Sequence, residues 1–97
     1  MELSSQAELF TAAVSIMAET PGAIQQRINR AYLSQLSKVD AGEVAEDVRA
    51  RVAALLARLG ATPMTRTMLT DDEAAAVAKE VVALTFELCR HDWTTAT

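Results

Sequence analysis

The chain contains one thiol and one imidazole, Cys89 and His91, the residue types that most often serve as nucleophile and general base. They stand two residues apart, so on a helix their side chains point to different sides and cannot pair. We expect Arg90 and His91 to lie in the last turn of a helix, where positive charge is favourable and Glu87 pairs with His91. The sequence therefore predicts no catalytic residues and no enzyme. The remaining enzymatic alternative is acid–base catalysis by Asp or Glu carboxylates alone.

Metal and cofactor sites face the same shortage of residues. A structural zinc site uses four ligands, mostly Cys and His, and this chain has two such residues in total. A carboxylate-bridged metal centre in a helical bundle needs acids that face inward, and Glu87 and Asp92 have no such partner in the predicted pattern. The other acids near apolar stripes fall on polar faces: Glu8, Glu19, Glu46 and Asp47. The three glycines form no phosphate-binding loop, so we expect no metal and no cofactor.

Residues 18–31 match the spacing of a helix-turn-helix, with Ala18, Gly22 and Ile28 as the small, turn and buried positions. The second helix of such a motif would present side chains that contact bases or phosphates: Gln26, Arg27, Asn29 and Arg30. Residues 21–40 are also the one locally basic segment. Against this stand the net charge of −4 and a proline within the turn, and an ordinary helical hairpin with a solvated face explains the same residues. A DNA-binding regulator is the second functional hypothesis.

Four helices are predicted from their capping signals, over about residues 5–18, 21–38, 42–59 and 71–92. Each begins at a recognisable cap, namely Ser5 to Glu8, Thr20-Pro21, Asp40 to Glu43 and Thr70 to Glu73. Gly60 is the expected left-handed C-cap of the third helix. The connection over 60–69 is long for a compact domain. We expect one all-α domain over residues 1–97, built as a compact four-helix bundle.

Apolar residues recur at helical rather than alternating spacing in all four segments. The fourth segment illustrates the pattern, with Ala74, Val77, Val81, Leu84 and Leu88 on one stripe and Ala78, Val82 and Thr85 beside it. Equivalent stripes run through Ile24, Ile28, Ala31, Leu36 and Val39, and through Val44, Val48, Val52, Leu55 and Leu59. These stripes define the predicted core.

The bulk composition agrees with a small globular protein. The 97 residues are 51% hydrophobic and 23% charged, which excludes a disordered chain. A single cysteine permits no intrachain disulfide and indicates a reducing compartment. No stretch resembles a signal peptide or a membrane span, so we expect a cytoplasmic protein and no membrane partner.

Two surfaces are candidates for binding another protein. The first helix is apolar around most of its circumference, and Leu9, Phe10, Ala13 and Met17 are expected to contact a partner, most simply a second copy of the chain. The alternative is that the exposed part of this helix is mainly alanine and needs no cover. The second surface is the 60–69 connection, where Met64, Arg66, Met68 and Leu69 either form an interface or fill gaps beneath the bundle.

The leading hypothesis is therefore a non-enzymatic protein–protein interaction module that forms a homodimer. An adaptor, a regulatory subunit or an inhibitor of another protein would each have this character. Its acidic surface suits a basic target, and nucleic acid is not an expected partner under this hypothesis.

Overall fold

Helices account for most of the chain in the computed structural model, which describes residues 4–61 and 68–96, with side chains described as far as Asp92. The described residues contain no strand. The elements are α1 (Ser5–Glu19), α2 (Ile24–Ser34), η1 (Leu36–Lys38), η2 (Ala41–Glu43), α3 (Glu46–Gly60) and α5 (Asp71–Ala96), where η denotes a 3-10 helix. The predicted all-α, bundle-like fold is confirmed.

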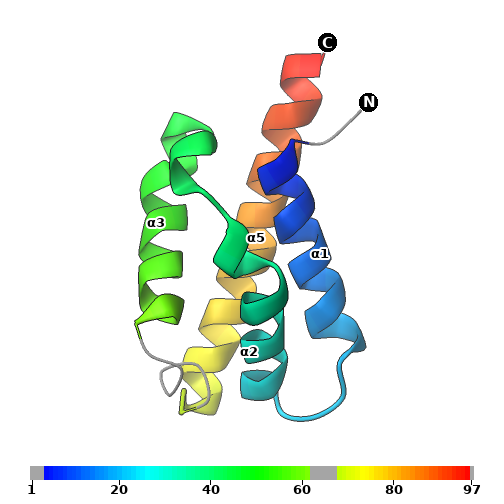
Figure 1. Cartoon of the computed structure of the whole chain (residues 1–97), viewed down its shortest axis with the longest axis vertical. Helices are drawn as coiled ribbons and strands as arrows, with labels where there is room; N and C mark the ends of the chain where they lie inside the picture. Colours follow the sequence, from blue (N-terminus) through cyan, green and yellow to red (C-terminus); the bar gives the residue numbers. More distant parts are fainter. Residues whose placement is uncertain (1–3, 62–67, 97) are drawn as a thin grey trace.

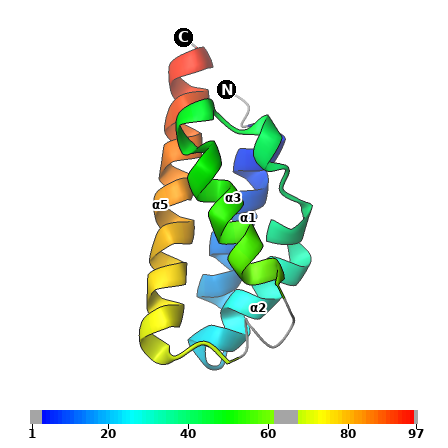
Figure 2. The same ribbon diagram turned by 90° about the vertical axis from the view of Figure 1, so that its left-hand side faces the viewer.

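Helix α5 is the longest helix described and runs the length of the molecule (Figure 1), along one side of it in the view of Figure 2. Its 26 residues extend about 39 Å at the usual helical rise, close to the 41 Å length of the whole structure. Helices α1 and α3 run antiparallel to it, and α2 lies at the end of the bundle where α1 finishes (Figures 1 and 2). Among the described residues, no helix has the length and apolarity required to cross a bilayer.

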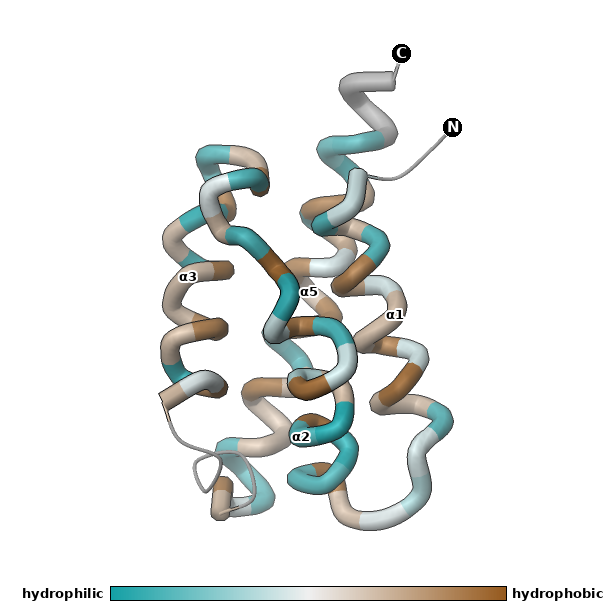
Figure 3. Tube along the Cα trace, viewed as in Figure 1, coloured by the Kyte–Doolittle hydropathy of each residue, from teal (hydrophilic) through white to brown (hydrophobic). Residues whose placement is uncertain are grey.

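The predicted stripes meet in one hydrophobic core. The fourth-segment stripe from Ala74 to Leu88 is buried along its full length, and so is the α3 stripe from Val48 to Leu59. Figure 3 shows the hydrophobic turns of α3 and α1 directed towards the interior of the bundle. The largest fully buried side chains are Phe10, Ile28, Leu36, Leu59 and Leu84. Each helix therefore contributes to a shared core.

The start of α5 is a reciprocal capping box, as predicted. The Glu73 amide donates to Thr70 Oγ1 at 3.1 Å, and the Thr70 amide donates to Glu73 Oε1 at 2.9 Å. The hydrogen bond from the Thr70 amide, followed by the contact with its hydroxyl, lowers the pKa of Glu73; desolvation opposes this, and the charge of Arg58 contributes least. The α1 cap lies one residue earlier than predicted, because Ser4 accepts from the Ala7 amide at 3.2 Å.

Substituting Glu73→Gln is expected to make the free energy of unfolding depend less on pH in the acidic range. A carboxyl group whose folded pKa is depressed stabilises the native state above its unfolded pKa, and this contribution is lost as the pH falls through the folded pKa. The native protein should therefore exceed the variant in stability at pH 6, and the difference should shrink by pH 3. Urea unfolding across this range measures it. Thr70→Ser keeps the backbone amide and the hydroxyl that contact Glu73, so it should retain the native pH dependence.

The connection between α1 and α2 differs from the predicted Thr20-Pro21 cap. Helix α2 begins at Ile24 with Ala23 as its N-cap, three residues later than expected. Gly22 has a φ of +107°, which breaks the helical path between Pro21 and Ala23. Pro21 and Gly22 therefore form the turn instead of opening the helix.

The boundaries of α3 differ from prediction at both ends. Asp40 does act as a cap, but it accepts from the Gly42 amide at 2.9 Å to begin η2, and α3 starts only at Glu46. The predicted left-handed cap at Gly60 is wrong, because the chain remains in the right-handed region through Ala61. A Cβ at Gly60 would lie 2.8 Å from the hydroxyl oxygen of Tyr32. The glycine allows close packing with α2 rather than a change of handedness.

Candidate interaction surface

The apolar face predicted on α1 is mostly covered within the chain. Phe10 and Ala13 are fully buried, Met17 is nearly so, and all three belong to the core. Leu9 is half-buried. The burial of Phe10, Ala13 and Met17 corrects the expectation that they contact a partner, because α1 packs against α2 and α5 of the same chain.

The second predicted surface is only partly described. Met64 and Arg66 lie outside the described residues. Met68 is exposed, whereas Leu69 is buried in the core, and its carbonyl accepts a 2.9 Å hydrogen bond from Gln25 Nε2. The same amide nitrogen also donates to Asp71 Oδ1 at 2.9 Å. Gln25 therefore joins α2 to the start of α5, and Leu69 has the packing role that the sequence left open.

A different apolar surface is exposed between α1 and α5. Phe86 is 72% exposed and Val82 is 37% exposed, one helical turn apart on α5. Beside them is a hollow of about 250 Å³ lined by Thr11, Val14, Val82, Thr85, Phe86 and Cys89. We call this hollow and its lining the α1–α5 groove. It combines a protruding aromatic ring with an adjacent depression.

The two threonines do not make the α1–α5 groove polar. Thr11 Oγ1 donates to the carbonyl of Ala7 at 2.8 Å, and Thr85 Oγ1 donates to the carbonyl of Val81 at 2.7 Å. Each hydroxyl is thus satisfied by its own helix, as is common for Thr in helices. Thr11 Oγ1 also lies 3.9 Å from Cys89 Sγ across the groove. The groove consequently offers apolar contact with little polar desolvation.

Charge differs between the two edges of the α1–α5 groove. Thr11 of the α1 edge belongs to the polar stripe of that helix, which also carries the exposed Glu8 and Glu19. Glu19 also lines a separate hollow with Arg30 of α2. On α5, Lys79 is exposed and lies seven residues before Phe86, which places it on the same helical face. One edge is therefore acidic and the other carries a basic residue.

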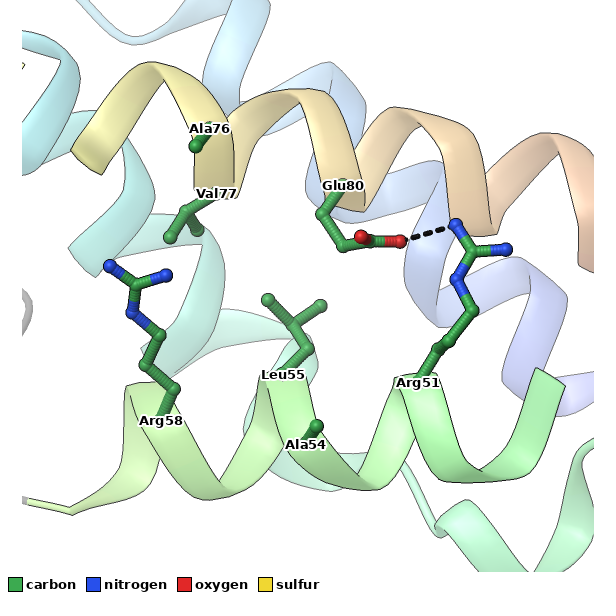
Figure 4. Close-up of a pocket in the computed structure, with 7 residues that line it drawn as sticks. All are labelled: Arg51, Ala54, Leu55, Arg58, Ala76, Val77 and Glu80. Carbon is green, nitrogen blue, oxygen red and sulfur yellow. Dashed lines mark hydrogen bonds and ion pairs between the residues drawn. The ribbon is translucent and has the colours of Figure 1, made fainter. Parts of the chain in front are cut away.

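A second depression lies between α3 and α5, and its ends are charged (Figure 4). Arg51 and Arg58 extend from α3 towards α5, with Leu55 and Val77 between them. Arg51 Nη2 pairs with Glu80 Oε1 at 2.5 Å, and Arg58 lies 3.6 Å from Glu73. Both guanidinium groups thus already contact acids of α5. We interpret this depression as part of the α3–α5 packing.

A polar cluster joins the other end of α3 to α5. His91 Nε2 lies 2.9 Å from Oδ1 and 3.1 Å from Oδ2 of Asp47, and Glu87 lies one turn before His91. We call Asp47, Glu87 and His91 the α3–α5 clip. The predicted helix end near residue 92 is corrected, because α5 continues to Ala96, and Glu87 also pairs with Arg90 at 2.7 Å. The hydrogen bond from Arg90, followed by its charge, lowers the pKa of Glu87.

The residues of the DNA-binding hypothesis do not share one exposed face. Arg27 is half-buried, its Nη1 donates to the carbonyl of Met17 at 3.3 Å, and its Nε is buried without a hydrogen-bond partner. Gln26, Asn29 and Arg30 do line a common shallow surface beside Thr20 and Pro21. One of the two expected arginine contacts, Arg27, is therefore directed towards the protein rather than towards a phosphate.

Sequence reasoning missed Phe86 and the contact between Asp47 and His91. Phe86 lies off the stripe from Ala74 to Leu88, and an aromatic residue on the outer side of an amphipathic helix is the signal that would have identified it. The Asp47–His91 contact depends on the register between two helices and has no local signal. The chain shows no significant match to any protein-family model, curated protein or solved structure.

Proposed function

We propose that this chain is a non-enzymatic protein–protein interaction module that forms a homodimer through the α1–α5 groove. The observation that carries the proposal is the exposure of Phe86, which is the most exposed of the large apolar side chains described. An exposed aromatic side chain beside an apolar hollow is characteristic of a surface that another protein covers.

The groove has the form that a two-fold interface requires. In such an interface the same patch faces itself, so it must contain both a protrusion and a depression that accepts it. Phe86 supplies the protrusion, and the hollow beside Thr11 and Val14 supplies the depression. The patch is therefore self-complementary in shape, which supports a second copy as the occupant.

The charged edges select one arrangement of the two copies. A two-fold axis parallel to the helices places α5 of one copy over α1 of the other, and so brings Lys79 towards the acidic edge with Glu19. An axis perpendicular to the helices places α5 over α5 in the reverse direction and leaves Lys79 without an acidic edge opposite it. Opposite charges therefore favour the first arrangement. We therefore propose that each α5 packs on the partner's α1.

The substitution Phe86→Asp tests this dimer. Sedimentation equilibrium or light scattering after size exclusion should give a dimer for the native chain and a monomer for the variant. Burial of one unpaired carboxylate in an apolar contact is sufficient to disrupt association. Leu33→Asp is the matched control, because Leu33 is also a large exposed apolar residue but lies on α2. It should remain dimeric.

Charge reversal tests the proposed orientation. Glu19→Lys and Lys79→Glu should each weaken association several-fold, and the double variant should restore it, with an effect that grows at low salt. A native chain that remains monomeric at high micromolar concentration would overturn the homodimer. A Phe86→Asp variant that dimerises as well as the native chain would place the interface elsewhere.

A further inference from the structure

The α3–α5 clip brings three metal-ligating side chains together from two helices. One donor atom from each of Asp47, Glu87 and His91 lies within 4.8 Å of the others. Glu87 and His91 are four residues apart, so both project from one face of α5, and Asp47 faces them from the first turn of α3. Two ligands one turn apart on one helix and a third on a neighbouring helix can contact the same ion, because residues four apart lie on one helical face.

We infer that Asp47, Glu87 and His91 bind a divalent transition-metal ion, with zinc as the representative of the class. Tetrahedral zinc with bonds near 2.1 Å requires its ligand atoms to stand about 3.4 Å apart. The distances between donor atoms of the α3–α5 clip bracket this value. His91 Nε2 lies 2.9 Å from Asp47 Oδ1, and no two of the three donor atoms are more than 4.8 Å apart. Small shifts of these partly exposed side chains would bring the three atoms to this spacing.

The ligand set selects against magnesium and calcium. Those ions prefer six or more oxygen ligands, whereas one imidazole nitrogen with two carboxylates suits zinc, cobalt or nickel. Three protein ligands leave a fourth position for water or another small ligand. His91 is one-third exposed, which leaves the site accessible from solvent.

Two arginines limit the affinity of the site. Arg90 Nη2 contacts Glu87 Oε2 at 2.7 Å, but a carboxylate has a second oxygen with lone pairs of its own. Arg51 also acts electrostatically on Glu87, although its guanidinium is directed to Glu80. Both cations raise the local potential, so we expect binding in the micromolar range rather than at the affinity of a structural zinc site.

Calorimetric titration of the chain, produced without a polyhistidine tag, tests the site with Zn²⁺, and the visible absorption of Co²⁺ reports its geometry. We expect one ion per chain. Because an ion that binds only the folded state stabilises it, zinc at tenfold its dissociation constant should raise Tm by about 5 °C or more. His91→Gln and Asp47→Asn should each weaken binding by roughly tenfold or more, since three ligands cannot spare one.

Two variants serve as controls for the metal titration. Asp72→Asn removes an exposed acid of α5 outside the clip, and Cys89→Ser removes the other soft ligand, which lies in the α1–α5 groove. Both should bind zinc as the native chain does, and so should Phe86→Asp, which separates this site from dimer formation. Equal binding by the native and His91→Gln chains, loss of binding in Cys89→Ser, or no binding at millimolar zinc would each overturn the inference and leave Asp47 and His91 as a hydrogen-bonded contact between α3 and α5.

Discussion

Replacing Phe10 with alanine is expected to lower the free energy of unfolding by about 3–5 kcal/mol, the usual cost of removing a fully buried phenylalanine. Phe10 is 0% exposed and lies in the shared core, where its neighbours can close the resulting cavity only in part. A domain of this size has a total stability of roughly 5–15 kcal/mol, so the variant should be marginally folded. Urea unfolding followed by circular dichroism measures the loss.

Phe86→Ala is the matched control, because it removes the same side chain from a site where it is 72% exposed. At protein concentrations low enough to separate the copies, it should change stability by no more than about 0.5 kcal/mol. At higher concentrations it should also remove the added stability that the proposed dimer would provide. Equal losses for both substitutions in dilute solution would contradict the burial that distinguishes the two phenylalanines.

The second large effect is expected at Gly22. Its φ of +107° is a conformation that L-residues rarely adopt, and a Cβ there would also meet Oε1 of Gln26. The side chain of Gln26 is flexible and can move, so the backbone conformation dominates the cost. Gly22→Ala should destabilise the chain by about 1–3 kcal/mol in thermal or urea unfolding.

A D-alanine at position 22, introduced by chemical ligation, separates conformation from side-chain bulk. D-residues favour positive φ, so this substitution should match or exceed the native stability by restricting the unfolded chain. If L- and D-alanine had the same effect, the turn between α1 and α2 would not have the left-handed conformation described above.

Local signals in the sequence were sufficient to predict the helices and most of the core. The Thr70–Glu73 box and the stripe from Ala74 to Leu88 depend only on neighbours within one helix, and both are as predicted. Gly60 shows where such reasoning fails. A glycine after a helical stripe indicates a left-handed cap, but here it accommodates Tyr32, which is distant in sequence.

The candidate sites were less predictable because they depend on how helices are placed against one another. An apolar α1 is compatible with packing inside one chain or between two chains, and the structure buries Phe10 and Ala13 within the chain. The contact between Asp47 and His91 spans 44 positions and requires the register of α3 along α5. Neither outcome can be derived from periodicity, which specifies the face of a helix but not its neighbour.

The pairing of the first helix with the last has a consequence for folding during translation. Helix α1 packs along α5, and the Ser4 amide donates to Asp92 Oδ2 at 2.8 Å across 88 positions. Ribosomes add about 5–20 residues per second, so several seconds pass between the synthesis of α1 and that of α5, one of the two helices that cover it. During that interval Phe10 lacks the part of the core that α5 supplies, and the nascent chain exposes apolar surface to chaperones and to aggregation.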